Sequence, residues 1–253
     1  HHGLEPVIAH LSGIRVIGPD LPGFGESSPL TEVPTTIDGY AAWLGAFVEK
    51  LGLTGTAVIF GHSFGSIVTS TAIANGLKTP KLILLNPIAA PALEGPSAFG
   101  TRLTVGFYGL SGWLPRAIGN AVLKNPLVPW FVSVTMIRSK NRRLNRWIHD
   151  QHARYFNRFS DRETVIAAFK ASISTDVSQV ATRVDVPTLL IGSDEDPITT
   201  VAALKHVQTL FPKAELTILH GVGHLVHYEM PRVAAEKIVA FLGTGSVVRA
   251  ANT

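Results

Sequence analysis

Short, mainly apolar runs alternate along the chain with longer stretches in which apolar residues recur at helical spacing. The runs predict strands at residues 14–17, 57–60, 82–85, 188–191 and 216–219. The longer stretches predict helices at residues 4–11, 37–51, 64–75, 201–211 and 231–242. Short apolar strands that alternate with helices are typical of a parallel sheet covered on both faces. The pattern therefore predicts an α/β fold with a mostly parallel sheet.

Residues 89–176 interrupt this rhythm. They favour helices broken by prolines, namely Pro96, Pro115, Pro126 and Pro129. Residues 98–170 contain 12 Lys and Arg against 3 Asp and Glu, and 11 of the 20 aromatic residues of the chain, whereas the remainder is mildly acidic. We therefore predict a separate helical insert at residues 89–176, within a core of residues 1–88 and 177–243. Residues 244–253 are expected to form a frayed tail.

Composition narrows the classes of function. Of the 253 residues, 46% are hydrophobic, which is enough for a packed core. The absence of cysteine excludes a disulfide scaffold, a thiol nucleophile and a cysteine zinc site. A net charge of +4 is too small to indicate nucleic acid, so no nucleic acid partner is expected. No signal peptide or membrane-spanning run is visible, and a cytoplasmic location is expected.

A serine stands at a predicted strand-to-helix turn. Residues 61–65 read Gly-His-Ser-Phe-Gly, with the strand before them and the helix after them. A sharp turn of this kind strains its central residue, and flanking glycines relieve the crowding. The hydroxyl of Ser63 should then project above the sheet. The N–H of Phe64, at the helix start, is placed to stabilise an oxyanion.

A serine hydroxyl needs a base to take its proton. His224 lies on a glycine-rich loop between the strand at 216–219 and the last helix, where sheets of this type place their chemistry. His227, one helical turn further on, is the rival base. His62 adjoins the serine, but neighbours at such a turn point in different directions, so we interpret it as structural.

The base in turn needs an acid to orient it. Asp194, Glu195 and Asp196 follow the strand at 188–191, and such a cluster is often only a solvated turn. We favour Asp196 as the acid, with Asp194 as the alternative. The chain order Ser63, Asp196, His224 is the order expected of a serine triad on this kind of sheet.

Four blocks of sequence resemble the α/β-hydrolase superfamily, in its lid-bearing branch of esterase- and lipase-like serine hydrolases. They are residues 20–27, residues 61–65, residues 196–198, and Gly223-His224 followed by Glu229 and Pro231. The resemblance implies that Ser63 is the nucleophile, Asp196 the acid and His224 the base. It makes residues 20–27 a structural turn. A phosphate-binding loop there is disfavoured because Ser28 replaces the third glycine.

The same resemblance implies strands that the sequence does not contain. Members of the superfamily normally open with three strands before the one expected at 14–17, and a His-Gly loop supplies the second oxyanion donor. His2-Gly3 could be that loop, but no strand precedes it. An inner strand cannot be dropped without leaving neighbours unpaired, so an upstream segment is expected to be missing.

The insert occupies the position of the lid in this superfamily. A lid would exclude water and shape the substrate cleft. Nine aromatic side chains offer an apolar lining for that cleft, unless they pack the core of the insert itself: Phe99, Phe107, Tyr108, Trp113, Trp130, Phe131, Trp147, Phe156 and Phe159. The basic run at residues 138–147 is interpreted as a solvated helix face, or else as weak contact with anionic lipid or an acidic substrate.

The resemblance implies a serine hydrolase that cleaves a small-molecule carboxylic ester, with an apolar acyl or aromatic substrate, through an acyl-enzyme. A thioesterase, a carbon–carbon bond hydrolase and a cofactor-free haloperoxidase use the same triad and remain alternatives. A ligand-binding protein on the hydrolase scaffold is the alternative from another class. No metal cluster or nucleotide loop is recognisable, so neither a cofactor nor a metal is expected.

Overall fold

A four-stranded parallel sheet forms the centre of the molecule. The computed structural model describes residues 2–91, 98–125, 127–155 and 158–243. Within them the strands lie in the order β1-β2-β3-β4, which is also their chain order. Their bounds are Ile59–His62 for β1, Leu82–Leu85 for β2, Thr188–Ser193 for β3 and Ala214–Leu219 for β4. All carboxyl ends therefore lie at one edge of the sheet.

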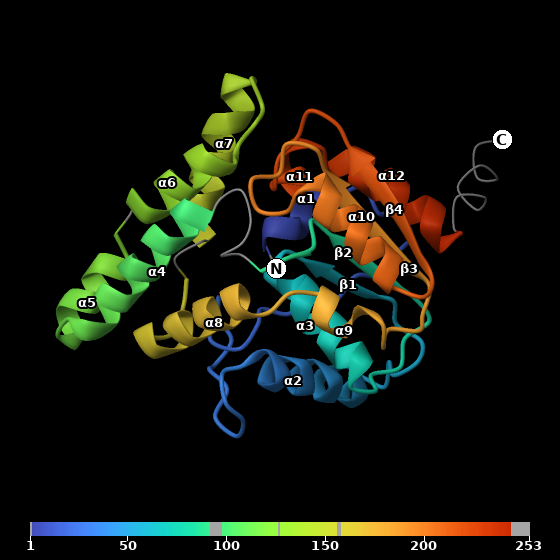
Figure 1. Cartoon of the computed structure of the whole chain (residues 1–253), viewed down its shortest axis with the longest axis horizontal. Helices are drawn as coiled ribbons and strands as arrows, with labels where there is room; N and C mark the ends of the chain where they lie inside the picture. The colour runs from blue at the N-terminus through green and yellow to red at the C-terminus, as the bar shows by residue number, and fades with distance from the viewer. Residues whose placement is uncertain (1, 92–97, 126, 156–157, 244–253) are drawn as a thin grey trace.

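Helices cover both faces of the sheet, as predicted (Figure 1). Leu82 and Leu84 pack with the helices of one face, and Ile83 and Leu85 pack with those of the other, because side chains alternate along a strand. The first face carries α2 (Ile37–Lys50), α3 (Phe64–Ala74), α9 (Ser178–Ala181) and α10 (Val201–Leu210). The second carries α1 (Glu5–Ile8), α11 (Val226–Glu229) and α12 (Pro231–Leu242).

A group of helices leaves the core between β2 and β3 and lies beside it, at the left of Figure 1. We call this group the insert; it comprises α4 (Ala98–Trp113), α5 (Arg116–Leu123), α6 (Leu127–Met136), α7 (Arg142–Tyr155) and α8 (Arg162–Ser174). Pro115 directly precedes α5, and Pro129 lies in the first turn of α6, where no intrahelical hydrogen bond is lost. Pro96 and Pro126 lie outside the described residues, as does the tail expected at 244–253. None of the described helices has the length and apolarity needed to cross a membrane.

Two predicted elements at the start of the chain differ from the structure. Residues 14–17 form no strand, and the side chains of Val16 and Ile17 are each 41% exposed. A strand needs a hydrogen-bonded neighbour, and no described segment pairs with these residues. The helix predicted at 4–11 shortens to a 3-10 turn at His2–Leu4 and the single turn of α1. Within the described residues β1 pairs with β2 alone, and a further strand beside it stays a prediction.

Candidate active site

Ser63 occupies a strained turn between β1 and α3. Its φ of 49° and ψ of −121° lie in a region that residues other than glycine rarely adopt. Hydrogen bonds hold the turn on both sides. The N–H of Ser63 donates to the carbonyl of Leu85 at 3.2 Å, and the hydroxyl of Ser66 donates to the carbonyl of Ser63 at 2.6 Å. The turn thus lifts the Ser63 side chain above the carboxyl edge of the sheet.

The two glycines that flank the turn have different roles. A Cβ atom on Gly61 would lie 2.4 Å from Oγ1 of Thr69 and 2.6 Å from the carbonyl oxygen of Gly65, so only glycine fits. A Cβ atom on Gly65 would meet nothing within 4 Å. Phe64 is the first residue of α3, and its N–H therefore has no partner within the helix.

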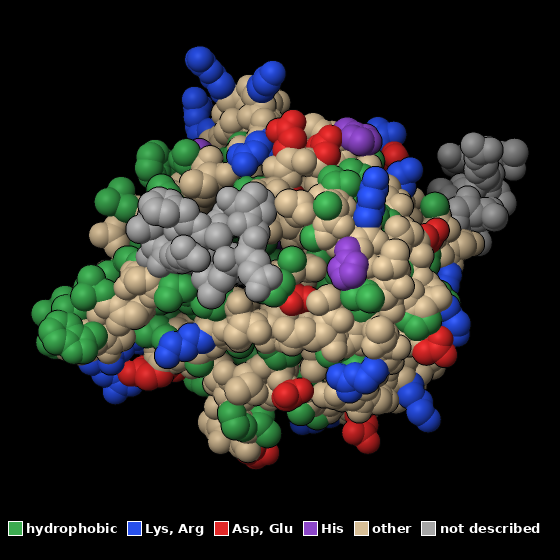
Figure 2. Space-filling view, viewed as in Figure 1, with side chains coloured by type: hydrophobic (Ala, Val, Ile, Leu, Met, Phe, Trp, Pro, Cys, Tyr) green, Lys and Arg blue, Asp and Glu red, His purple; other side chains and the backbone are tan. Residues whose placement is uncertain are grey.

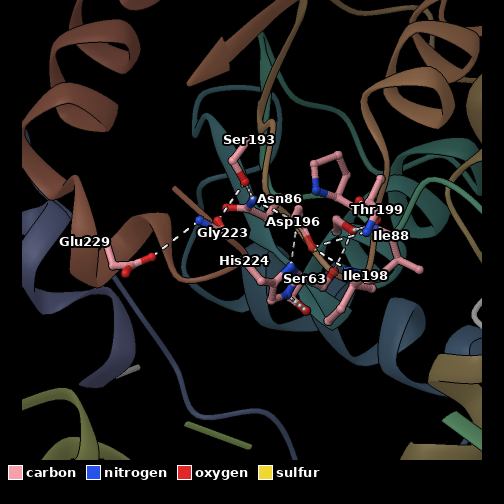
Figure 3. Close-up of polar contacts among 12 residues, drawn as sticks. Ser63, Asn86, Ile88, Ser193, Asp196, Ile198, Thr199, Gly223, His224 and Glu229 are labelled. Carbon is pink, nitrogen blue, oxygen red and sulfur yellow. Dashed lines mark hydrogen bonds and ion pairs between the residues drawn. The ribbon is translucent and has the colours of Figure 1, made fainter. Parts of the chain in front are cut away.

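A chain of hydrogen bonds joins three side chains from separate parts of the sequence (Figure 3). Nε2 of His224 lies 2.8 Å from Oγ of Ser63, and Nδ1 of His224 lies 2.9 Å from Oδ2 of Asp196. A carboxylate only accepts hydrogen bonds, so Nδ1 carries the proton and Nε2 is free to accept the hydroxyl proton. His224 is 3% exposed and Asp196 is 7% exposed, which shields both from water.

Four donors hold the carboxylate of Asp196. Oδ1 accepts from the N–H groups of Ile198 at 2.7 Å and Thr199 at 3.2 Å. Oδ2 accepts from His224 and also from Nδ2 of Asn86 at 3.0 Å. Burial acts to raise the pKa of Asp196, but His224 and the two backbone N–H groups outweigh it and lower the pKa below its ordinary value. The carboxylate is therefore charged near neutral pH.

Asn86 and Ser193 belong to this network, although the motifs did not identify them. Asn86 follows β2 directly, with a φ of 42°, and is fully buried. Its Nδ2 also donates to Oγ of Ser193 at 2.9 Å, and Ser193 donates to the carbonyl of Gly223 at 2.7 Å. The available signal was position alone, because both residues stand at the carboxyl edge of the sheet.

The alternative acid and base lie elsewhere. Asp194 accepts from Nδ1 of His220 at 2.8 Å and from the N–H of Gly221 at 2.9 Å, on an outer loop. His227 is buried, with its ring centroid 4.3 Å from that of His62. Burial, reinforced by the neighbouring histidines, lowers the pKa of His62 to about 3 and that of His227 well below its ordinary value. Both rings are therefore neutral near pH 7, and both line the cavity beside Ser63 and His224.

Glu229 connects the loop of the histidine to the insert. Its Oε1 accepts from the N–H groups of Arg138 at 2.9 Å and Ser139 at 2.5 Å, and its Oε2 accepts from the N–H of Gly223 at 3.4 Å. The two backbones are in close contact there. A Cβ atom on Gly223 would lie 2.9 Å from both the carbonyl oxygen of Met136 and Cγ of Arg138. The position of His224 is thus tied to the segment between α6 and α7.

A cavity of about 350 Å³ opens at Ser63 and His224. The core contributes Phe24, Ile198 and Leu225 to its wall, and the insert contributes Val132, Met136, Tyr155 and Arg158. His2 and Gly3 also line it. The site therefore lies between the core and the insert, and its wall combines apolar side chains with charged ones, among them Asp20, Glu26 and Arg158.

The turn at residues 20–27 closes one side of this cavity. Gly25 donates from its N–H to the carbonyl of Arg158 at 2.9 Å, and Ser160 donates to the carbonyl of Gly23 at 2.8 Å. These bonds fasten the turn to the segment of the insert between α7 and α8. No helix follows the turn before α2, so it lacks the helix start that a phosphate-binding loop uses.

Of the nine aromatic residues predicted either to line the cleft or to pack the core of the insert, none whose side chain the structure describes lines the cleft, although Tyr155, outside that set, does. None of Phe107, Tyr108, Trp113, Trp130, Phe131, Trp147 and Phe159 contacts the cavity. Tyr108 stacks on Phe169, and Phe159 is buried. Four further side chains of the set are exposed to solvent: Trp113, Trp130, Phe131 and Trp147. Phe99 and Phe156 lie outside the side chains described. Val132 and Met136 take the expected place because they face inward on α6.

No group of three or more histidine or acidic side chains among the described residues is arranged to hold a metal ion. The histidines near the site are engaged otherwise. His224 binds Ser63 and Asp196, and the rings of His62 and His227 pack against one another. The arrangement is suited to proton transfer at a serine hydroxyl.

Comparison with known proteins gives independent evidence on the fold. The family model described as "alpha/beta hydrolase fold" matches residues 1–231. "Lipase 1" of Psychrobacter immobilis is 23% identical over 248 residues, which cover 93% of this chain and 71% of that protein. "Uncharacterized hydrolase YugF" of Bacillus subtilis is 24% identical, covering 90% of this chain and 80% of that protein.

Solved structures show the same fold. An esterase from Exiguobacterium antarcticum superposes with a TM-score of 0.74 at 17% identity, covering 96% of this chain and 87% of its own. A bromoperoxidase from Bacillus anthracis gives 0.73 at 18% identity, also covering 96% and 87%. Structures titled as an esterase and as a bromoperoxidase thus share one architecture with this chain.

Proposed function

The chain belongs to the α/β-hydrolase fold family, and from this premise we propose that it is a serine hydrolase that cleaves a carboxylic ester through an acyl-enzyme. The observation that carries the proposal is the hydrogen-bonded chain from Ser63 through His224 to Asp196. The names of the lipases and esterases among its relatives favour an ester over other acyl substrates.

Ser63, His224 and Asp196 each have a role in the acylation step. As Oγ of Ser63 attacks the ester carbonyl, Nε2 of His224 takes its proton, and the imidazolium then returns that proton to the leaving alcohol. Asp196 keeps the ring in the required tautomer and stabilises its positive charge. Water attacks the acyl-enzyme in the second half of the reaction, with His224 again as the base.

The oxyanion that forms at the carbonyl carbon needs a donor. The N–H of Phe64 begins α3, an 11-residue helix, and the positive end of the helix dipole favours charge at this point. It is the donor that we assign. A single preorganised donor of this type contributes about 10²–10³ in rate.

The cavity sets the kind of acyl group. A volume of about 350 Å³ is at the lower end of the range for small-molecule sites. Phe24, Val132 and Met136 provide an apolar wall. We therefore assign a short or medium acyl chain, or a single aromatic ring, to the substrate.

Labelling with a fluorophosphonate separates an enzyme from a binding protein on the same scaffold. Wild type should be labelled on Ser63, and Ser63→Ala should abolish both labelling and hydrolysis of p-nitrophenyl butyrate. Ser133→Ala is the matched control, because Ser133 also hydrogen-bonds a histidine, His152, but is fully buried in the insert. That variant should still be labelled. Folded wild-type protein that resists the label would exclude a reactive serine.

A substrate panel then separates enzymes that share the triad. It compares p-nitrophenyl esters of increasing chain length, a thioester with the same acyl group, and a diketone that a carbon–carbon bond hydrolase would cleave. The proposal expects the highest kcat/KM for esters of about four to eight carbons, a range that a cavity of this size accepts. A preference for the thioester would make the chain a thioesterase instead.

A further inference from the structure

Helix α6 turns an apolar stripe toward solvent. Leu127 is 66% exposed, Trp130 54%, Phe131 62% and Val134 48%. These positions are spaced i, i+3, i+4 and i+7, so they lie on one face of the helix. α6 contains no charged residue at all. A stripe of this spacing normally faces a protein core, and here it does not.

Other helices of the insert extend the exposed apolar surface. Trp113 at the end of α4 is 84% exposed, Leu110 of the same helix is 56% exposed, and Ile118 of α5 is 52% exposed. Figure 2 shows hydrophobic side chains gathered on the part of the insert that lies away from the core. A surface rich in exposed tryptophan and leucine is typical of an interaction site.

Basic side chains accompany this surface and indicate the charge of its partner. The start of α7, which packs against α6, carries Arg142, Arg143 and Arg146, all exposed, and Lys140 precedes them. The only acid on α7, Asp150, is paired with Arg154 on the same helix. Figure 2 shows several Lys and Arg side chains projecting from this end of the insert. The partner should therefore have a negatively charged surface with an apolar interior directly below it.

We propose that the exposed stripe of α6, together with the basic start of α7, docks on the surface of an anionic phospholipid bilayer. Tryptophan, phenylalanine and leucine enter the boundary between headgroups and acyl chains, while arginine and lysine bind anionic headgroups. This contact is separate from the proposed hydrolysis. It would hold the cavity close to the bilayer, because Val132 and Met136 on the inner side of α6 line that cavity.

Sedimentation of the full chain with vesicles tests the proposal. Vesicles of phosphatidylcholine with a quarter phosphatidylglycerol should bind the protein, and pure phosphatidylcholine should bind it at least tenfold more weakly. Leu127→Ser combined with Phe131→Ser should weaken binding to the anionic vesicles at least tenfold. Neither side chain lines the cavity, so hydrolysis of soluble p-nitrophenyl butyrate should be unchanged.

Two further variants separate the contributions. Leu51→Ser removes a leucine that is 45% exposed on the core and should leave vesicle binding unchanged. Arg142→Gln combined with Arg143→Gln should weaken binding to anionic vesicles and reduce its dependence on salt. The proposal would be overturned if wild type bound both vesicle types equally. It would also be overturned if the Leu127→Ser/Phe131→Ser variant bound anionic vesicles as strongly as wild type. A concentration-dependent dimer that the same variant abolishes would assign the stripe to self-association and overturn it too.

Discussion

Asn86 donates a hydrogen bond over 3.0 Å to Oδ2 of Asp196, the same oxygen atom that accepts Nδ1–H of His224. One carboxylate oxygen is thus fixed by an amide on one strand end while it orients a ring from another loop. Burial of all three side chains makes these bonds strong and their loss costly. Asn86 is therefore a positioning residue for the proposed base.

Asn86→Ala should lower kcat for ester hydrolysis about tenfold and change KM little. The expected loss corresponds to about 1.4 kcal/mol, close to the lower limit for a hydrogen bond to a charged group. Steady-state kinetics with p-nitrophenyl butyrate measure it. Asn75→Ala, which removes an exposed asparagine after α3, is the control and should not alter either constant. Unchanged kcat in Asn86→Ala would remove the residue from the mechanism.

The two aspartates of the acidic turn should differ sharply. Asp196→Asn should reduce kcat about ten-thousand-fold, because the amide favours the wrong tautomer of His224. Asp194→Asn should keep nearly full activity, since Asp194 binds His220 on the outer loop. Kinetics of both purified variants decide the matter. Loss of turnover in Asp194→Asn alone would show that the assigned acid is wrong.

The connection through Glu229 should matter for turnover. Glu229→Ala removes the acceptor shared by Arg138, Ser139 and Gly223, and we expect kcat/KM to fall about tenfold or more. Glu229→Gln keeps one carbonyl oxygen and should recover part of the loss. Glu236→Gln, on the exposed side of α12, is the control. Equal activity of Glu229→Ala and wild type would contradict a role in positioning.

Stability should fall in mild acid. The pKa values of His62 and His152 are lowered by burial to about 3 and about 4, and that of His227 is also well below its ordinary value. An unfolded histidine has a pKa of about 6.5, so between these values the unfolded chain binds more protons than the folded one. Each of the three then lowers the free energy of unfolding by about 1.4 kcal/mol per pH unit as the pH falls through this window.

Urea unfolding at pH 7, 6 and 5 measures this slope. His227→Gln should flatten it by the share of one buried histidine. His206→Gln, at an exposed position on α10, should leave the slope as it is in wild type. A free energy of unfolding that is constant from pH 7 to pH 5 would contradict neutral burial of these rings.

The glycines beside Ser63 offer a matched pair. Gly61→Ala would place Cβ within 2.6 Å of two oxygen atoms, and we expect a loss of stability of about 1–3 kcal/mol together with lower activity. Gly65→Ala meets nothing within 4 Å and should be as stable as wild type or slightly more stable. Thermal unfolding of both variants checks the difference. Similar melting temperatures would show that the turn is not constrained as described.

Regular elements of the core were predictable because local patterns and burial agree there. The strand predicted at 82–85 and the helix predicted at 231–242 have the same bounds as β2 and α12. The run at 14–17, apolar except for Arg15, carries nearly the same local signal as the true strands. It fails because strand formation depends on a neighbour, which hydrophobic pattern does not report.

The candidate site likewise has parts that the sequence predicts and parts that it does not. The strand-to-helix setting of Ser63 and the chain order of the three side chains are visible in the sequence. The contacts of Asn86 and Glu229 are not, because each joins residues about 90 or more positions apart. Whether the aromatic residues of the insert line the cleft, pack the insert or face solvent could not be predicted, because composition counts side chains without giving their direction.

The single carboxylate that holds both the histidine loop and the segment after α6 has a consequence for selectivity. A bulky ester that pushed the insert outward would strain the same bonds that keep the imidazole in place. Such an ester would be hydrolysed with a lower kcat even if it bound tightly. Esters of different size would then differ in kcat more than in binding affinity.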